Sequence, residues 1–201
     1  MSGSGDLSHP GKTPVTQQHR EQVNGHKAFA LWFTGLPGSG KTTLAQALEF
    51  ALFQRNYHCY VLDGDRLRDG LNRDLGFSPQ DRTENIRRAG EVARMMVDAG
   101  IIVITAFISP YLADRDKVRS LFPQGHFVEV FLKCSLEICE KRDPKGLYRK
   151  ARQGLIDSFT GVSAPYEPPV APEITLETGE LSVGESLDVL LDFAVKRYPL
   201  V

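Results

Sequence analysis

The sequence has little that would direct it to a membrane or to an oxidising compartment. No apolar run in its 201 residues approaches the roughly 20 residues that a membrane span requires. Residues 1–25 are polar and lack the apolar core of a signal peptide. The 3 cysteines are an odd number and lie in or beside apolar stretches, which favours free thiols over disulfides or metal ligation. We therefore expect a cytoplasmic protein without a membrane anchor.

The sequence also lacks an excess of charge of either sign. Its 24 Lys and Arg residues oppose 25 Asp and Glu residues, for a formal net charge of −1. This balance gives no reason to expect nucleic acid as a partner. The hydrophobic share of 41% and the charged share of 24% are ordinary for a globular protein. A mass of 22.3 kDa suits one α/β domain with a sizeable core.

One segment has the pattern of a phosphate-binding loop. Residues 35–42 read Gly-Leu-Pro-Gly-Ser-Gly-Lys-Thr, which matches G-x-x-x-x-G-K-[ST]. An apolar stretch of strand length precedes the motif, and apolar residues at helical spacing follow it. Backbone N–H groups of such a loop and the N-terminus of the next helix bind phosphate. We expect Lys41 to reach the β- and γ-phosphates and Thr42 to offer its hydroxyl to Mg²⁺; the alternative is a plain glycine-rich turn.

Alternating strand and helix patterns predict an α/β fold with a parallel sheet that has helices on both faces. The predicted strands cover 28–34, 57–63, 101–107, 126–132 and, more weakly, 173–177. The predicted helices cover 41–55, 79–99, 110–121, 135–142, 145–153 and 184–197. We interpret 1–25 as a flexible N-terminal arm that is ordered at most near its end, and 26–201 as one domain. The Gly- and Pro-containing stretch 143–172 is interpreted as a lid over the carboxyl ends of the strands, where ligands of such sheets bind.

Asp63 ends the second predicted strand and is followed by Gly64. A carboxylate at this edge lies near the phosphate loop, which suits a general base or a partner of Mg²⁺. An ordinary Asp-Gly turn is an equally good interpretation of the local pattern. The predicted strand 101–107 does not end in Asp-Glu and so supplies no carboxylate of its own, which favours the chemical role for Asp63. The chain also lacks the Asn-Lys-x-Asp motif that is typical of GTPases.

Arginines are crowded into the region just after Asp65. They are Arg66, Arg68, Arg73, Arg82, Arg87 and Arg88. Arginine suits phosphate and sulfate because its planar fork donates two parallel hydrogen bonds. For any single one of them, a salt bridge on a solvated helix face is the commoner arrangement. The cluster as a whole, beside a phosphate loop, favours an anionic second substrate.

Ser109 emerges at the end of the third predicted strand, directly before Pro110. Such a serine can cap a helix that begins with Pro110, and it can equally contact a ligand. No histidine lies near it in the sequence, so the pattern gives no reason to call it a nucleophile.

At this point the chain resembles the adenylyl-sulfate kinases over about residues 9–195. The phosphate loop is shared by many families, whereas the other matching segments are specific. The matching segments are 35–42, 62–65, 74–78, 81–82 with 84–88, 106–110, 142–148 and 159–161. The resemblance implies a three-layer P-loop NTPase fold, a P-loop kinase domain over 26–201, and phosphorylation of the ribose 3′-hydroxyl of adenosine 5′-phosphosulfate by ATP with Mg²⁺. It also implies a homodimer.

The resemblance implies a role for each matching residue. ATP would be bound by Gly35, Leu36, Pro37, Gly38, Ser39, Gly40, Lys41, Thr42, Thr43 and Arg142. Adenosine phosphosulfate would be bound by Asp65, Arg68, Phe77, Arg82, Asn85, Ile108, Ser109, Lys145 and Phe159. The catalytic residues would be Asp63, Lys41 and Ser109. Asp63 would orient or deprotonate the 3′-hydroxyl and support Mg²⁺ with Thr42, while Phe77 and Phe159 would stack on the two faces of the substrate adenine.

Two alternatives and one mechanistic question stay open. The chain could be another P-loop nucleoside or nucleotide kinase, or a nucleotide-binding regulatory protein without turnover. The family is also described with a phosphoserine at the Ser109 position, which would make the protein a phosphoprotein. We favour direct transfer between two bound substrates, because in-line phosphoryl transfer needs positioning and charge neutralisation rather than a covalent relay.

Overall fold

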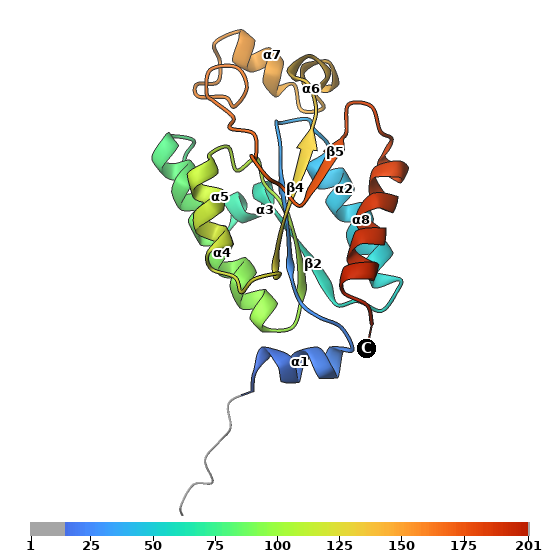
Figure 1. Cartoon of the computed structure of the whole chain (residues 1–201). Coiled ribbons are helices and arrows are strands. Elements are labelled where there is room, and N and C mark those ends of the chain that lie inside the picture. Colours follow the sequence, from blue (N-terminus) through green and yellow to red (C-terminus); the bar gives the residue numbers. More distant parts are fainter. Residues whose placement is uncertain (1–14, 201) are drawn as a thin grey trace, which may run out of the picture.

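The computed structural model of the chain describes residues 15–200. Over these residues the chain forms a five-stranded parallel sheet with helices on both faces (Figure 1). The strands are β1 (Ala30–Thr34), β2 (Cys59–Asp63), β3 (Ile102–Ala106), β4 (Phe127–Lys133) and β5 (Ile174–Glu177). Their spatial order is β2-β3-β1-β4-β5. Each strand lies within two residues of its predicted range, and the predicted three-layer α/β fold is confirmed.

Alternation of side chains along β1 creates two separate cores. Phe29, Leu31 and Phe33 face α2 (Lys41–Phe53) and α8 (Val183–Arg197). Ala30 and Trp32 face the other layer, which consists of α4 (Pro79–Asp98) and α5 (Leu112–Arg119). All five residues of β1 are buried because both faces of this central strand are covered. In such a covered sheet, ligands bind at the carboxyl ends of the strands.

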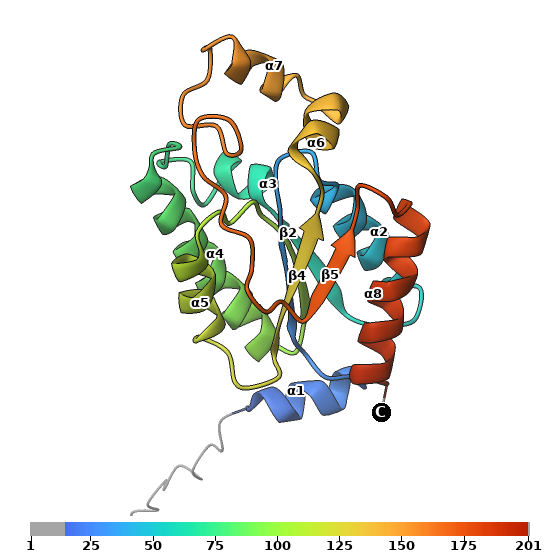
Figure 2. The ribbon, with the colours of Figure 1, turned by 45° about the horizontal axis from the view of Figure 1, so that its top comes forward.

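Three short helices lie beyond that edge. They are α3 (Gly64–Asp69), α6 (Leu136–Arg142) and α7 (Leu147–Arg152). Figure 2 shows α6 and α7 above the carboxyl end of β4. Helix α3 was not predicted from the sequence, because its six residues are too few for a periodic pattern. These elements, with the segment that leads from α7 to β5, enclose the space above the sheet.

The N-terminal region contains a helix near the end of the predicted arm. Residues Gln17–Asn24 form helix α1. A capping box between Thr16 and His19 lies at the start of this helix. Buried Glu21 accepts a hydrogen bond from the backbone N–H of Ala28, at 2.9 Å. Within the range 1–25 that was interpreted as an arm, residues 17–24 are thus ordered as a helix near its end; residues 1–14 lie outside the described part of the chain.

The structure also settles two smaller points. Helix α5 begins at Leu112 with Tyr111 as its N-cap residue, so the alternative that Ser109 caps this helix is wrong. The 3 cysteines are free, as predicted. None of the helices formed by residues 15–200 is long and apolar enough to cross a membrane.

Candidate active site

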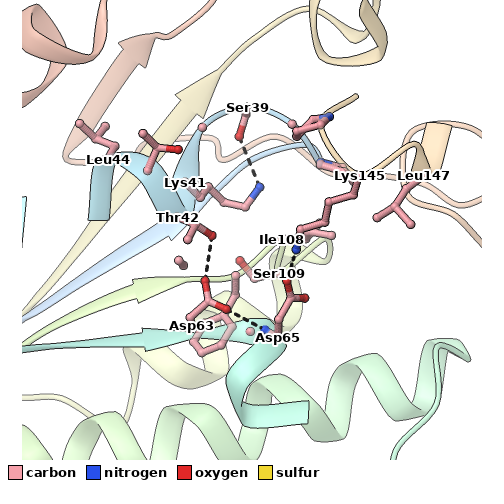
Figure 3. A pocket seen from close by; sticks show the side chains of 18 of the residues that line it. Ser39, Lys41, Thr42, Leu44, Asp63, Asp65, Ile108, Ser109, Lys145 and Leu147 are labelled. Carbon is pink, nitrogen blue, oxygen red and sulfur yellow. Dashed lines mark hydrogen bonds and ion pairs between the residues drawn. The ribbon is translucent and has the colours of Figure 1, made fainter. Parts of the chain in front are cut away.

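A cavity of about 770 Å³ opens at the carboxyl edge of the sheet. Its walls come from the phosphate loop, the end of β2, the segment after β3, the start of α4, the α6–α7 connection and the junction of β5 with α8. Figure 3 shows side chains from several of these elements pointing into the same space. The sequence therefore brings together segments that lie more than a hundred positions apart.

The phosphate loop needs glycine at its close approaches. A Cβ on Gly35 would lie 2.7 Å from the carbonyl oxygen of Leu132. Gly38 has a φ of 77°, and its Cβ would lie 3.0 Å from the carbonyl oxygen of Cys139. Helix α2 follows directly and begins at Lys41. Its free N–H groups and its dipole therefore point at the space that phosphates would occupy.

Lys41 is buried inside this loop. Its Nζ donates to the carbonyl oxygens of Gly35 and Leu36, at 2.8 and 2.7 Å. It also donates to Oγ of Ser39 at 3.3 Å (Figure 3). Burial disfavours the charged ammonium and lowers the pKa of Lys41 to about 8. The amine thus has three neutral partners, which an anionic phosphate can outcompete.

Asp63 caps a helix and also lies in the cavity wall. Its Oδ1 accepts from the N–H of Asp65 at 2.9 Å and so caps helix α3. Its Oδ2 accepts the hydroxyl proton of Thr42 at 2.8 Å. The carboxylate is therefore both a turn residue and part of the cavity wall beside the phosphate loop.

The pair of Thr42 and Asp63 fits Mg²⁺ bound through a nucleotide. Mg²⁺ prefers oxygen ligands, keeps several waters and commonly uses one or two protein groups with substrate phosphates. Within residues 15–200 there is no group of three or more His, Cys, Asp and Glu side chains that could hold a metal alone. One hydroxyl and one carboxylate next to a phosphate loop match the nucleotide-dependent arrangement.

Two arginines and one exposed ring form the opposite wall. The Arg68 guanidinium lies 4.4 Å from the centre of the Phe77 ring, and that of Arg82 lies 5.6 Å away. Phe77 is 57% exposed, so it is not a core residue beneath the arginine-rich helix. Burial lowers the pKa of both arginines. Neither forms an ion pair with another of the described residues.

The other arginines of the cluster behave differently. Arg87 and Arg88 form ion pairs with Glu84, and Arg88 also pairs with Asp74. These two arginines therefore match the alternative of salt bridges on a solvated helix face. Only Arg68 and Arg82 of the six line the cavity. Asn85 lines it as well, and its Oδ1 accepts from the buried amide of Asn72 at 3.0 Å.

Ile108 and Ser109 line the cavity after β3. Ser109 is 2% exposed and has a φ of 40°, which is unusual for a residue with a Cβ. Its Oγ accepts a hydrogen bond from the indole N–H of Trp32, at 3.3 Å. The structure therefore holds Ser109 in a strained and enclosed position at the cavity wall.

Lys145 closes the cavity from the lid side. Its Nζ forms an ion pair with Asp65 on α3, and this carboxylate raises the pKa of Lys145 (Figure 3). Arg142, also at the wall, donates to the carbonyl oxygen of Thr178 at 2.6 Å. The α6–α7 region therefore contacts both the β2 side of the cavity, through Lys145, and the β5 side, through Arg142.

Phe159 lies elsewhere in this conformation. Its side chain is 7% exposed and packs edge-on against Tyr148, with 5.0 Å between ring centres. It is absent from the described residues that line the cavity, whereas Phe77 is among them. The expected pair of rings around one base is not assembled here. Instead, Tyr148 donates its hydroxyl proton to the carbonyl oxygen of Pro37 in the phosphate loop, at 2.9 Å.

Of the predicted ATP-binding residues, those from Pro37 to Thr43 line the cavity together with Arg142, and Gly35 and Leu36 do not. The lining residues that were not predicted include four at one junction, namely Thr178, Leu181, Val183 and Ser186. They lie where β5 ends and α8 begins. The available signal was the end of a parallel strand followed by a helix start, which marks the ligand edge of this sheet class.

Comparisons with known proteins agree on one family. The model of the adenylylsulphate kinase family matches residues 27–177. The adenylyl-sulfate kinase of Staphylococcus haemolyticus is 59% identical over 179 residues, which cover 89% of this chain and 90% of that protein. An APS kinase of Mycobacterium tuberculosis, solved with AMPPNP and APS, superposes with a TM-score of 0.79 and is 44% identical. That match covers 83% of this chain and 96% of the solved one.

A hexameric APS kinase from Thiobacillus denitrificans is 30% identical, with a TM-score of 0.65. That match covers 92% of this chain and 32% of the longer solved chain. The family match extends over the phosphate loop, Asp63, the Arg68–Arg82 wall and Ser109, all of which the cavity unites. The chain belongs to the adenylyl-sulfate kinase family.

Proposed function

We propose that this protein transfers the γ-phosphoryl group of ATP to the ribose 3′-hydroxyl of adenosine 5′-phosphosulfate. The products are 3′-phosphoadenosine 5′-phosphosulfate and ADP, and the reaction belongs to sulfate activation and assimilation. One observation carries the proposal beyond family membership. A single cavity has a phosphate loop on one side and, on the other, an exposed ring beside two arginines that form no ion pair within residues 15–200.

The two sides have complementary tasks. The phosphate loop and Lys41 bind and neutralise the ATP phosphates, and Mg²⁺ supplies a further positive charge near Thr42 and Asp63 when it is bound. The ring of Phe77 offers a stacking face for the adenine of the second substrate. Arg68 and Arg82 supply the forked donors that suit tetrahedral phosphate and sulfate oxygens.

Asp63 is the candidate base. The Thr42 bond to Oδ2 and the helix cap at Oδ1 fix its carboxylate at the β2 end. A fixed carboxylate can accept the proton of a hydroxyl that is held within hydrogen-bond reach. We propose direct transfer, since Ser109 is enclosed and its Oγ is already bonded to Trp32. Phosphorylation of Ser109 is the alternative.

Residues 143–172 are proposed to act as a lid. Lys145 and Arg142 reach the cavity from this side, and closure excludes water from the phosphoryl group. The bond from Tyr148 to Pro37 links the lid to the phosphate loop. Movement of this segment is also what would bring Phe159 to the cavity. Hydrogen exchange with and without both nucleotides tests the lid: we expect greater protection of 143–172 when both are bound, and equal protection would remove closure from the mechanism.

The reaction is tested by a coupled assay of ADP release, with and without adenosine phosphosulfate. We expect release that depends on this substrate and on Mg²⁺. Turnover with another nucleoside or nucleotide and not with adenosine phosphosulfate would favour the other P-loop kinases. Binding of ATP with no turnover on any such substrate would favour a regulatory protein.

We also propose that the protein works in the cytoplasm as a homodimer. The balanced composition and the free cysteines support the compartment. The hexameric relative supports self-association within the family. Light scattering of the purified protein measures the number of subunits, and a monomer at working concentration would contradict the dimer.

A further inference from the structure

Arg115, on α5, is a buried arginine that the proposed chemistry does not use. Its side chain is 2% exposed and donates to three different elements. Nε donates to Oε1 of Glu129 on β4 at 2.7 Å, and Nη1 donates to the carbonyl oxygen of Ser109 at 2.6 Å. Nη2 donates to the carbonyl oxygen of Glu167 at 2.7 Å. Each of its three nitrogens thus has a hydrogen-bond acceptor, so the buried charge fixes the groups around it.

The first of those groups is the strained peptide at the cavity wall. Ser109 has a φ of 40°, a region that residues with a Cβ adopt only when their surroundings hold them there. Arg115 holds its carbonyl oxygen, and the Thr34 hydroxyl donates to the preceding carbonyl of Ile108 at 2.8 Å. The guanidinium is thus a main support of the conformation that places Ile108 and Ser109 in the cavity.

The second group is the C-terminal base of the lid. The N–H of Glu167 donates to the carbonyl oxygen of Pro110 at 2.8 Å, and its side chain accepts from the N–H of Leu112 at 2.7 Å. The hydroxyl of Tyr166 lies 3.0 Å from Oγ1 of Thr34. Residues 166–167 are therefore bonded to residues 108–112, and Arg115 bridges the two segments.

We propose that Arg115 is a positioning residue, which holds the Ser109 peptide and the lid base at Glu167 as one unit. The inference rests on the proposed function, in which the Ser109 segment contacts adenosine phosphosulfate. The phosphate loop is held from within by Lys41, which donates to the carbonyl oxygen of Gly35, and it has no bond to Arg115. Loss of the bridge therefore weakens binding of adenosine phosphosulfate and leaves binding of ATP almost unchanged.

Arg115→Lys is the informative variant. It keeps the positive charge beside Glu129, but a single ammonium cannot span three acceptors in three directions. Because small misplacements of positioning groups are costly, we expect KM for adenosine phosphosulfate to rise about tenfold, with KM for ATP within about twofold of wild type.

Glu129→Gln is the matched control. It retains an oxygen acceptor for Nε and removes the charge of the buried pair, so it should lower the melting temperature while sparing both KM values. The contrary result is that both variants raise KM for both substrates in step with lost thermal stability. Arg115 is then only structural.

A second variant serves if Arg115→Lys does not fold. Tyr166→Phe keeps the ring and removes only the hydroxyl contact to Thr34, so we expect KM for adenosine phosphosulfate to rise about threefold. An unchanged KM for adenosine phosphosulfate in Arg115→Lys, or in Tyr166→Phe where Arg115→Lys does not fold, overturns the proposal while wild type remains active. If wild type itself shows no turnover of adenosine phosphosulfate, the proposed function fails instead.

Discussion

The unusual pKa of Lys41 makes nucleotide binding a proton-uptake reaction. Burial lowers this pKa from its ordinary value of 10.5 to about 8, while the ammonium donates only to neutral oxygens. Phosphate oxygens favour the charged form and so raise the pKa towards the ordinary value. A full return of the Lys41 pKa to its ordinary value corresponds to about 3 kcal/mol of binding free energy, since each pKa unit is worth 1.36 kcal/mol.

The sign and size of the effect follow from this difference. Below about pH 8 the free protein already carries the proton, and binding takes up little. At pH 8, binding takes up about 0.5 proton, and at pH 9 about 0.9. Affinity for the nucleotide therefore falls about tenfold between pH 7 and pH 9. In the free protein, the same lowered pKa makes stability rise with pH between about 8 and 10.5, because the unfolded chain binds the proton more tightly.

Titration calorimetry in buffers of different ionisation enthalpy measures this proton uptake directly. The ligand is a non-hydrolysable ATP analogue with Mg²⁺, whose phosphates are already ionised at pH 8–9. Lys41→Arg is the control, because arginine stays protonated throughout this range. Proton uptake near zero for wild type at pH 9, or equal uptake by Lys41→Arg, would refute the account of Lys41.

Three further predictions concern the other side chains of the site. Asp63→Asn keeps the shape but removes the charge and one of the two acceptor oxygens, so kcat should fall about a hundredfold or more; near wild-type kcat would leave the carboxylate a cap only. Ser109→Ala should keep substantial activity, whereas a phosphoserine trapped at a competent rate in single turnovers with labelled ATP, with the alanine variant inactive, would establish the covalent route. Phe159→Ala should raise KM for adenosine phosphosulfate and spare KM for ATP; a loss confined to ATP would show that its packing on Tyr148 beside the phosphate loop is what matters.

The sheet could be predicted because buried parallel strands are nearly continuous apolar runs. The two helices that were missed lack such a signal. Helix α1 is polar, and its Arg20 and Asn24 bond to Asp98 and Gly100, contacts that span more than seventy positions. Helix α3 begins where Asp63 caps it, and six residues show no period. In both cases the deciding interactions are tertiary or end-specific, and local periodicity does not report them.

The parts of the site that lie in one contiguous stretch of sequence could be predicted, whereas the parts that distant segments assemble could not. The phosphate loop is one contiguous motif, and its strand-loop-helix context is visible in the sequence. Thr178 and Ser186 carry no motif, and only the topology brings the end of β5 beside β4 at the ligand edge. The position of Phe159 depends on whether its ring packs on Tyr148 or faces the cavity, a choice that side-chain packing in the lid makes.

Asp63 shows why the structural and chemical interpretations of a residue need not compete. One carboxylate oxygen caps α3 and the other accepts from Thr42. The cap fixes the carboxylate and, through Asp65, also places the carboxylate that pairs with Lys145 of the lid. A general base must be held in a defined place before its basicity counts. The turn that the Asp-Gly pattern predicts is therefore the means by which the proposed base is positioned, and the same turn brings the lid to the cavity.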